Sequence, residues 1–354
     1  MKFLYGLLVL VPVALLSHYL GGPAVLTFGA AALGIVPLAA LLGRATEALA
    51  ERAGPNVSGL INSTQGNAAE LIITFFAIRA GLLELVKASI TGSILGNLLL
   101  VMGASLLVGG LRHGVQRFDR TPAGLNATML MLAVIALGIP SLFSHAIEVG
   151  TGHMAVEYLS LGVAGAMLLV YVLSQFYLLR NGREVPSSGA HRAPSGASAW
   201  PLWKTLGGLA LSTALIAWLS EILVAAVEPA LERLGWTEFF IGVVIIPLVG
   251  NAAEHLVAVQ VAAKDEMDLS LGISVGSGLQ VALFVAPVLV FLSLAMGNPL
   301  TLVFNTFELA ALGAASIIAA VVSQDGESNW MEGVQLLVVY LILALGFFFL
   351  PMSR

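Results

Sequence analysis

This 354-residue sequence contains no cysteine, and only 10% of its residues are charged. The lack of cysteine excludes disulfides, thiolate metal sites and a cysteine nucleophile. Hydrophobic residues make up 58% of the chain and its mean hydropathy is +0.98, so a protein of this length has too little polar surface to fold in water. The composition therefore predicts a protein that is surrounded by lipid.

Long apolar runs are the main feature that the sequence does contain. A helix needs about 20 mostly apolar residues to cross a hydrocarbon core of about 30 Å. The runs are continuous and do not alternate like the strands of a β-barrel. We therefore predict an all-α membrane protein with eleven transmembrane helices. They cover approximately residues 3–20, 22–43, 55–78, 88–111, 121–143, 155–179, 205–227, 239–263, 269–296, 299–322 and 333–351.

Positive charges divide unevenly between the two sides of this arrangement. With the N-terminus in the cytoplasm, the cytoplasmic side receives eleven of the 15 Lys and Arg residues, and the other side receives Arg79, Lys87, Arg233 and Arg354. An excess of Lys and Arg marks the cytoplasmic side of a membrane protein. We expect a multi-pass protein of the cell (inner) membrane with a cytoplasmic N-terminus and an external C-terminus.

A single long polar stretch, residues 181–199, interrupts the apolar runs and is rich in Pro, Ser, Gly and Ala. This composition is typical of a flexible linker. We predict an accessory first transmembrane helix at residues 1–21, a first repeat at 22–180, a cytoplasmic linker at 181–203 and a second repeat at 204–354.

The two halves of the chain carry the same pentapeptide. GNAAE at residues 66–70 recurs 184 residues later at 250–254, and the Gly-Ser pair at 92–93 recurs with the same offset at 276–277. The copies of GNAAE fall in the third and the eighth predicted spans, so the second copy enters the membrane from the opposite face. The pattern indicates two inverted five-helix repeats, an architecture that places a substrate site near the bilayer midplane.

Each GNAAE copy places a glutamate within a predicted span, Glu70 in the first and Glu254 in the second. A charged carboxylate in the middle of a membrane costs about 3 kcal/mol on insertion scales, so it needs a proton, a cation or a partner. The nearest basic residues, Arg79 and Lys264, stand about 14 Å away along a helix. Structural contacts between membrane helices usually involve a single Asn, Ser or Gln. We therefore predict that both glutamates are functional.

Other oxygen-bearing side chains accompany the two acids. The Asn of each GNAAE copy stands one turn before its Glu, and Gly66, Gly250 and Pro247 weaken the helix there. Ca2+ takes 6 to 8 oxygen ligands, whereas zinc and copper favour imidazole or thiolate. Small polar residues on the next helix can either bind the cation or serve close helix packing, and both interpretations stay open for them. The candidate metal-binding residues are Glu70, Glu254, Asn67, Asn251, Ser93, Ser277, Gln280 and Asn97.

Two further residues are secondary candidates for a proton path. Glu308 lies within the tenth predicted span, and its alternative interpretation is a position near an interface or a local polar contact. His255 follows Glu254 by one position, about 100° around a helix. It therefore faces away from that acid, where packing, hydrogen bonding or proton relay are the open alternatives.

The two GNAAE segments and four other segments resemble the cation/proton exchanger (CAX) family of the calcium/cation antiporter superfamily. The other segments are residues 43–52 (GRATEALAER), 92–97 (GSILGN), 264–280 and 324–330 (QDGESNW). The resemblance covers nearly the whole chain. It implies that Glu70 and Glu254 are paired cation and proton carriers, with Asn67 and Asn251 beside them. It also implies an accessory first helix followed by a five-plus-five inverted core, and it disfavours coupling to Na+.

Burial favours the neutral form of a carboxyl group, so Ca2+ and protons should compete for the two glutamates. We predict a secondary-active Ca2+/H+ antiporter that exports Ca2+ by alternating access. Its substrates are Ca2+ and protons, its surroundings the lipid bilayer, and no cofactor or nucleic acid is expected. The alternatives are a divalent-cation channel and an Mn2+/H+ exchanger on the same scaffold. An enzyme is disfavoured because HExxH is absent and a single His stands among the candidate residues. The oligomeric state stays open, a homo-oligomer included.

Overall fold

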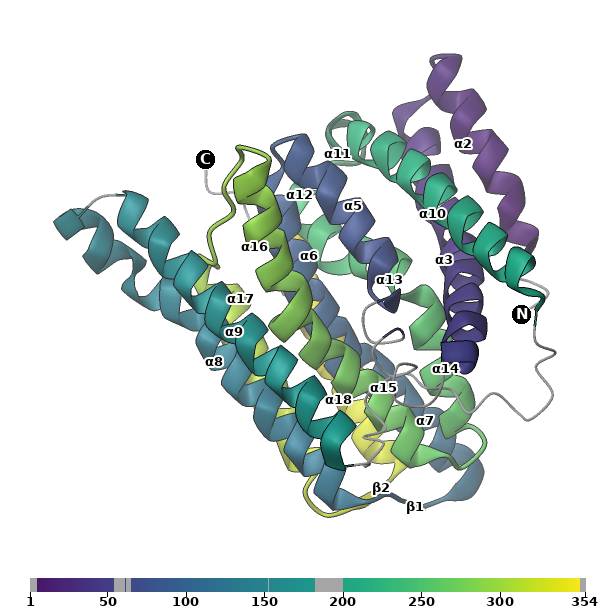
Figure 1. Ribbon diagram of the computed structural model, residues 1–354, viewed down its shortest axis with the longest axis vertical. Coiled ribbons are helices and arrows are strands. Elements are labelled where there is room, and N and C mark those ends of the chain that lie inside the picture. Colours follow the sequence, from purple (N-terminus) through teal and green to yellow (C-terminus); the bar gives the residue numbers. More distant parts are fainter. Residues whose placement is uncertain (1–4, 54–60, 62–64, 152, 182–199, 351–354) are drawn as a thin grey trace.

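The computed structural model describes residues 5–53, 61, 65–151, 153–181 and 200–350, and nearly every element in this part of the chain is a helix (Figure 1). Most of the predicted linker therefore lies outside the described residues. The first half contains η1 (Leu7–Val9), α2 (Leu10–Tyr19), α3 (Ala24–Ala53), α5 (Ala68–Arg79), α6 (Leu83–Leu95), η2 (Gly96–Val101), α7 (Met102–His113), β1 (Gln116–Arg117), α8 (Arg120–Thr151) and α9 (His153–Asn181).

The second half repeats this helical character and ends with a long apolar helix. It contains α10 (Leu202–Ala225), α11 (Val227–Leu234), α12 (Glu238–Phe240), η3 (Ile241–Ile245), α13 (Ile246–Gly250), α14 (Ala252–Ala262), α15 (Met267–Gln280), η4 (Val281–Val285), α16 (Ala286–Ala295), α17 (Thr306–Val322), β2 (Glu327–Ser328) and α18 (Trp330–Phe349). The segments η2, η3 and η4 are π-helical, and η1 is a 3-10 turn.

Each of the eleven predicted spans overlaps at least one of these helices, and α3 and α8 extend beyond the spans predicted for them. Part of the span predicted at 55–78 lies outside the described residues. Among the described residues, seven helices are long and apolar enough to cross a membrane, and the pair Val227–Leu234 and Glu238–Gly250, bent by 114°, would make an eighth if it is one span. Three shorter apolar helices complete the set: Leu7–Tyr19, Ala252–Ala262 and Thr306–Val322. The prediction of a multi-pass helical membrane protein is confirmed, and the number of eleven crossings stays a prediction.

The sequence repeat continues as a repeat of local structure. The start of α14 follows the start of α5 by 184 residues, and the start of α15 follows the start of α6 by the same 184. Both α6 and α15 then pass through a π-helical segment, η2 or η4, before they continue as α7 or α16. Because π segments are rare and concentrate at functional sites, their recurrence at equivalent places makes α6 and α15 candidates for the functional site.

Paired helices flank the repeated elements on either side. The long helix α3 packs along α10 and also against α2, while α8 and α9 pack together at the opposite edge of the molecule (Figure 1). The elements α5, α6 and α13 to α16 lie between these two groups. Only 17% of the apolar window of α18 and 28% of that of α9 are buried, which is expected for helices that face lipid.

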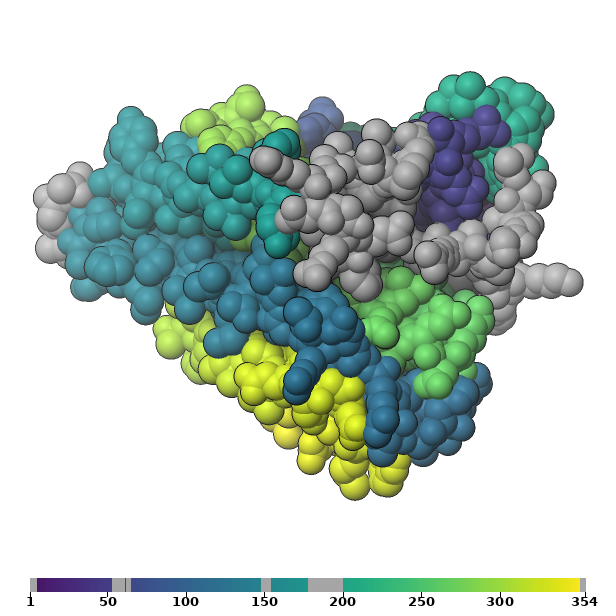
Figure 2. Space-filling model, turned by 60° about the horizontal axis from the view of Figure 1, so that its bottom comes forward, coloured from purple at the N-terminus to yellow at the C-terminus, as the bar shows by residue number. Residues whose placement is uncertain are grey.

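Three connections meet at the end of the molecule that the charge distribution predicts to be cytoplasmic. Strand β1 pairs antiparallel with β2. The Gln116 side-chain amide donates to the carbonyl of Ala262 (3.2 Å) and to Oδ1 of Asp265 (2.8 Å). Figure 2 shows this end from below, with the blue α7–α8 connection, the green α14–α15 region and the yellow β2–α18 region side by side. These contacts join the two halves of the chain.

Candidate functional site

Both GNAAE segments lie at breaks between helices. Asn67 directly precedes α5, and Asn251 separates α13 from α14 with a φ of −109° and a ψ of 9°. Glu70 and Glu254 therefore stand in the first turn of α5 and α14. A Cβ added to Gly250 would make ordinary van der Waals contact with Cβ of Glu70 at 3.4 Å, so the two breaks lie directly against each other.

The carboxylate of Glu70 is fully buried and receives hydrogen bonds from both halves of the chain. The Ser93 hydroxyl, on α6, donates to Oε1 over 2.5 Å. The Asn251 side-chain amide, from the second repeat, donates to Oε2 over 3.2 Å and to the Ser93 oxygen over 3.3 Å. Bonds of this kind stabilise a charged carboxylate in a place where water does not reach it.

Glu254 has a related but more open environment. The Ser277 hydroxyl donates to its Oε2 over 2.8 Å, and Asn97 of η2 donates to the Ser277 oxygen over 3.2 Å. The spacing between acid and serine is 23 residues in both halves. Glu254 is only half-buried, and Asn251, which donates to Glu70, precedes it by three residues in the same motif. The two acids therefore form one site with an inner and a more accessible member.

The two asparagines of the motif each leave one oxygen unused. The Asn67 amide nitrogen donates to Oε1 of Gln280 over 3.0 Å. Within the described part of the chain, Oδ1 of Asn67 and Oδ1 of Asn251 are buried and have no hydrogen-bond partner. A buried oxygen without a donor is costly, so this arrangement fits a ligand that presents positive charge to both amides.

The predicted metal-binding residues thus come together from both halves. All eight are buried or half-buried and each takes part in a hydrogen bond with another of the eight. No group of three or more His, Cys, Asp or Glu side chains suited to a metal ion is present in the described ranges. A cation here would therefore be held by two carboxylates and by neutral oxygens. We call these eight residues the central cluster.

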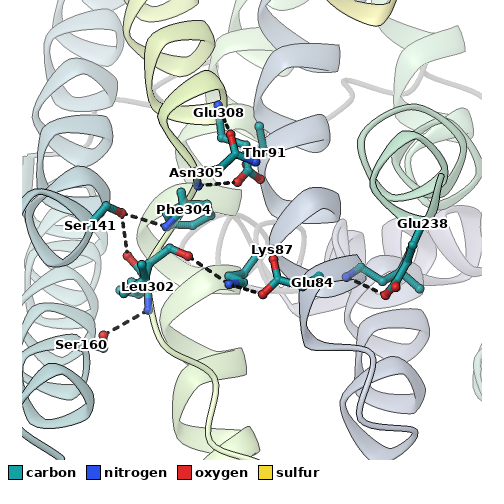
Figure 3. Close-up of polar contacts among 12 residues, drawn as sticks. Glu84, Lys87, Thr91, Ser141, Ser160, Glu238, Leu302, Phe304, Asn305 and Glu308 are labelled. Atoms are coloured by element: carbon teal, nitrogen blue, oxygen red, sulfur yellow. Dashed lines mark hydrogen bonds and ion pairs between the residues drawn. The ribbon is translucent and has the colours of Figure 1, made fainter. Parts of the chain in front are cut away.

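Among the described residues, no hydrogen bond joins Glu308 to the central cluster, and Figure 3 shows it beside Thr91 and Asn305. It is 2% exposed and forms a capping box at the start of α17, in which Asn305 and Glu308 each accept a hydrogen bond from the backbone nitrogen of the other. Its Oε1 also accepts a 2.9 Å hydrogen bond from the Thr91 hydroxyl of α6. Local polar contact, one of the two sequence interpretations, thus describes its surroundings.

His255 follows Glu254 on α14, and its Nε2 is buried without a hydrogen-bond partner among the described residues. No contact joins its ring to the carboxylates of the central cluster in the described part of the chain. Its role in a proton path stays a prediction.

Two contacts of this region were not predicted from the sequence. Thr74 donates to the backbone oxygen of Glu70 over 2.7 Å, and Thr91 contacts Glu308, which is 217 residues away. The i, i+4 spacing of Glu70 and Thr74 was a readable signal, because hydroxyls in helices often bond the preceding turn. The contact of Thr91 had no local signal, since it depends on how α6 packs against α17.

Carboxylates at two paired helix breaks inside apolar helices are typical of membrane cation transporters. The chain matches the family described as "Sodium/calcium exchanger protein" over residues 23–180 and 204–349, and it belongs to that family. The resemblance predicted from the motifs is therefore confirmed.

Individual relatives agree with this placement. The chain is 45% identical over 360 residues to a "Ca(2+)/H(+) antiporter" of Aphanothece halophytica, covering 98% of this chain and 96% of the relative. It is 42% identical to "Ca(2+)/H(+) antiporter ChaA" of Bacillus subtilis, covering 96% and 97%. The solved structure of native YfkE is 40% identical, with a TM-score of 0.85 over 98% of this chain and 100% of that one. A structure of the "H+/Ca2+ Exchanger CAX" shares the fold, with a TM-score of 0.75 and 16% identity over 98% and 92%.

Proposed function

We propose that this protein is a secondary-active Ca2+/H+ antiporter that exports Ca2+ from the cytoplasm in exchange for protons. Glu70 and Glu254 act as the shared carriers of both substrates. The relatives named as Ca2+/H+ antiporters match nearly the full length of the chain, which supports the same substrates here.

The observation that carries the proposal is the pair of unused amide oxygens beside two carboxylates. Within the described residues, Oδ1 of Asn67 and Oδ1 of Asn251 are buried without hydrogen-bond partners, and they belong to the same helix breaks as Glu70 and Glu254. Hard oxygen ligands suit Ca2+. We infer that these four side chains are the principal ligands. Ser93, Ser277, Asn97 and Gln280 position them or complete the coordination.

Competition for the same carboxylates can account for coupled exchange. One Ca2+ or two protons would neutralise the two charges of Glu70 and Glu254. A site with both charges uncompensated would be costly to carry through the low-dielectric interior. Only the loaded forms then change access easily, and Ca2+ leak without proton return is suppressed.

The proposed transport uses the topology that the sequence predicts. The chain crosses the membrane eleven times with a cytoplasmic N-terminus, an accessory first helix and two inverted five-helix repeats. The equal offset of α5 and α14 and of α6 and α15 supports two equivalent repeats. A polar site between equivalent repeats suits alternating access more than a continuous pore, since channels generally build pores from symmetric subunits.

An Mn2+/H+ exchanger on the same scaffold is the second candidate, because Mn2+ also accepts oxygen ligands. A hydrolase finds less support. Residues 272–276 match the pattern Gly-x-Ser-x-Gly, but this segment lies inside α15 and its Ser274 hydroxyl donates to the carbonyl of Ser270. The nucleophile of that pattern normally sits on a sharp turn between a strand and a helix.

Uptake of radioactive Ca2+ into everted membrane vesicles tests the proposal. Vesicles with an acidic lumen should accumulate Ca2+, and collapse of the pH gradient by a protonophore should stop accumulation. Mn2+ added as a competitor ranks the two cations. Absence of Ca2+ uptake with and without the gradient would contradict the proposal.

A further inference from the structure

Helix α6 carries a second polar face that does not point to the central cluster. Glu84, Lys87 and Thr91 stand at positions i, i+3 and i+7 and share one face. Ser93, which contacts Glu70, follows Thr91 by two positions, about 200° around the helix. Figure 3 shows the second face turned to α17 and to the extended segment before it. The same helix thus contacts two separate ionisable sites.

Exposure falls steadily along this second face. The side chain of Glu84 is 70% exposed and that of Lys87 is 12% exposed, whereas Thr91 and Glu308 are 0% and 2% exposed. The Lys87 ammonium lies 2.6 Å from Oε1 of Glu84 and donates to the carbonyl of Val303 over 3.0 Å. Polar side chains therefore stand at successive turns of this face, from the surface toward the buried Glu308 carboxylate. Contacts among the described residues join Lys87 to Glu84 and Thr91 to Glu308.

The row ends at Glu308. The Thr91 hydroxyl donates to Oε1 and the backbone nitrogen of Asn305 donates to Oε2, both over 2.9 Å. The next position on this face of α6 is Leu95, and Leu98 follows in η2; both are buried and apolar. No described side chain on this face continues the row to the central cluster, so Glu308 is a terminus and not a step of a continuous path.

The groups around Glu308 suit a proton and not Ca2+. Ca2+ needs 6 to 8 oxygen ligands, and the only charged groups that act on Glu308 from α6 are the Lys87 ammonium, which repels a divalent cation, and Glu84. Of the other elements that pack against α17, η2 has no titratable side chain, and the described titratable groups of α8, Arg120 and His145, are exposed. A proton needs only one carboxylate oxygen.

We propose that Glu308 is a proton-binding site that is reached from the external face along Glu84 and Lys87 and is separate from the Ca2+-binding central cluster. This inference rests on the proposed antiport and on the predicted orientation. The proton moves from external water to a carboxylate oxygen of Glu308, where one O–H bond forms. Protonation alters the contact with Thr91, and so the attachment of α6 to α17. Because α6 also carries Ser93, external protons act on Glu70 through this helix.

Glu308→Gln separates proton binding from helix capping, because the amide oxygen still accepts the Asn305 hydrogen bond while the group no longer titrates. In everted vesicles the external face lines the lumen. We expect the variant to bind Ca2+ with unchanged affinity in calorimetry at fixed pH. The measured quantity is the ratio of Ca2+ uptake at a luminal pH of about 6 to uptake at a luminal pH of about 8. This ratio should be about fivefold smaller in the variant than in the unmodified protein, a size typical of coupling between two sites.

Thr91→Val keeps the carboxyl group and removes its contact to α6, so it should weaken the luminal pH dependence in the same direction. An unchanged luminal pH profile in Glu308→Gln would overturn the proposal and leave only a helix cap. Loss of Ca2+ binding in Glu308→Gln, as expected for Glu70→Gln, would overturn it too, by placing Glu308 in the Ca2+ site. If Glu308→Gln does not fold, an unchanged profile in Thr91→Val overturns it. Normal Ca2+ binding in Glu70→Gln would contradict the proposed function instead, which keeps the two failures apart.

Discussion

Glu70 and Glu254 are equivalent in sequence but differ in their surroundings. Glu70 is fully buried and bonded to Ser93 and Asn251, whereas Glu254 is half-buried and bonded to Ser277. Asn251 crosses from the second repeat to the acid of the first, and its counterpart Asn67 donates to Gln280 instead. Two chemically equal acids are thus held in unequal surroundings.

Glu70→Gln and Glu254→Gln are each expected to abolish pH-driven Ca2+ transport. Glutamine keeps the shape of glutamate but cannot ionise, so the site loses half the charge that opposes Ca2+ and one of its two proton carriers. The fold should persist, because removal of an acid from the membrane interior relieves an insertion cost. Vesicle uptake and melting in detergent measure the two effects.

The matched control is Glu221→Gln on α10, whose side chain is 59% exposed and lies 3.9 Å from Arg79. Exposed ion pairs contribute little, so this variant should transport normally. Near-normal exchange in either central variant would show that the two acids are structural.

Ser93→Ala and Ser277→Ala should weaken Ca2+ binding without abolishing transport. Each removes one hydroxyl that holds a carboxylate, a loss of about 1 kcal/mol or about fivefold in affinity. Ser274→Ala is the control on α15, because its hydroxyl bonds only to the carbonyl of Ser270 among the contacts of the described chain. Calorimetric titration with Ca2+ compares the three. Equal affinities would show that the two serines serve helix packing.

At the scale of elements, close contact between α6 and η3 depends on glycine. A Cβ on Gly92 would lie 2.0 Å from the backbone oxygen of Val243, and a Cβ on Gly242 would lie 2.5 Å from Cβ of Ala88. This crossing brings the first repeat against the second immediately beside Ser93. Small residues permit such close approach of membrane helices.

Gly92→Ala is therefore expected to destabilise the protein by about 1 to 3 kcal/mol, the usual cost of overpacking, and to reduce transport by displacing Ser93. Gly96→Ala is the matched control in the adjoining η2, because a Cβ there would meet no atom of the described chain within 4 Å. Melting in detergent and Ca2+ uptake should separate the variants. Equal melting would contradict the close contact of α6 with η3.

At the scale of the whole molecule, the predicted topology can be tested with tags. A tag at Ser188, which lies outside the described residues, should be cytoplasmic, and a tag after Arg354 should be external. The reason is the excess of Lys and Arg on the first of these sides. Protease protection in intact and everted vesicles reports the side of each tag. If both tags lie on one side, the number of crossings between Ser188 and Arg354 is even. That result would contradict the five spans predicted there and with them the inverted repeat.

Local composition and spacing were enough to predict much of this molecule. The apolar runs indicated helices in lipid, because the hydropathy of a run can be summed from its own residues without knowledge of distant contacts. The repeated GNAAE segments predicted a site at both acids and the asparagines beside them, and this role stays a prediction. Gly250 indicated the weakened helix that the break at Asn251 confirms. These signals lie within one or two turns of the chain, where sequence neighbours are also spatial neighbours.

Contacts between distant segments were decided only by the tertiary structure. The donation from Asn251 to Glu70 spans 181 residues, and that from Thr91 to Glu308 spans 217. Equal spacing in the two repeats could not reveal that Glu70 is fully buried while Glu254 is half-buried. Identical local sequences define identical local structure, but burial and hydrogen-bond partners depend on which helices pack together, and that is set by the free energy of the whole fold.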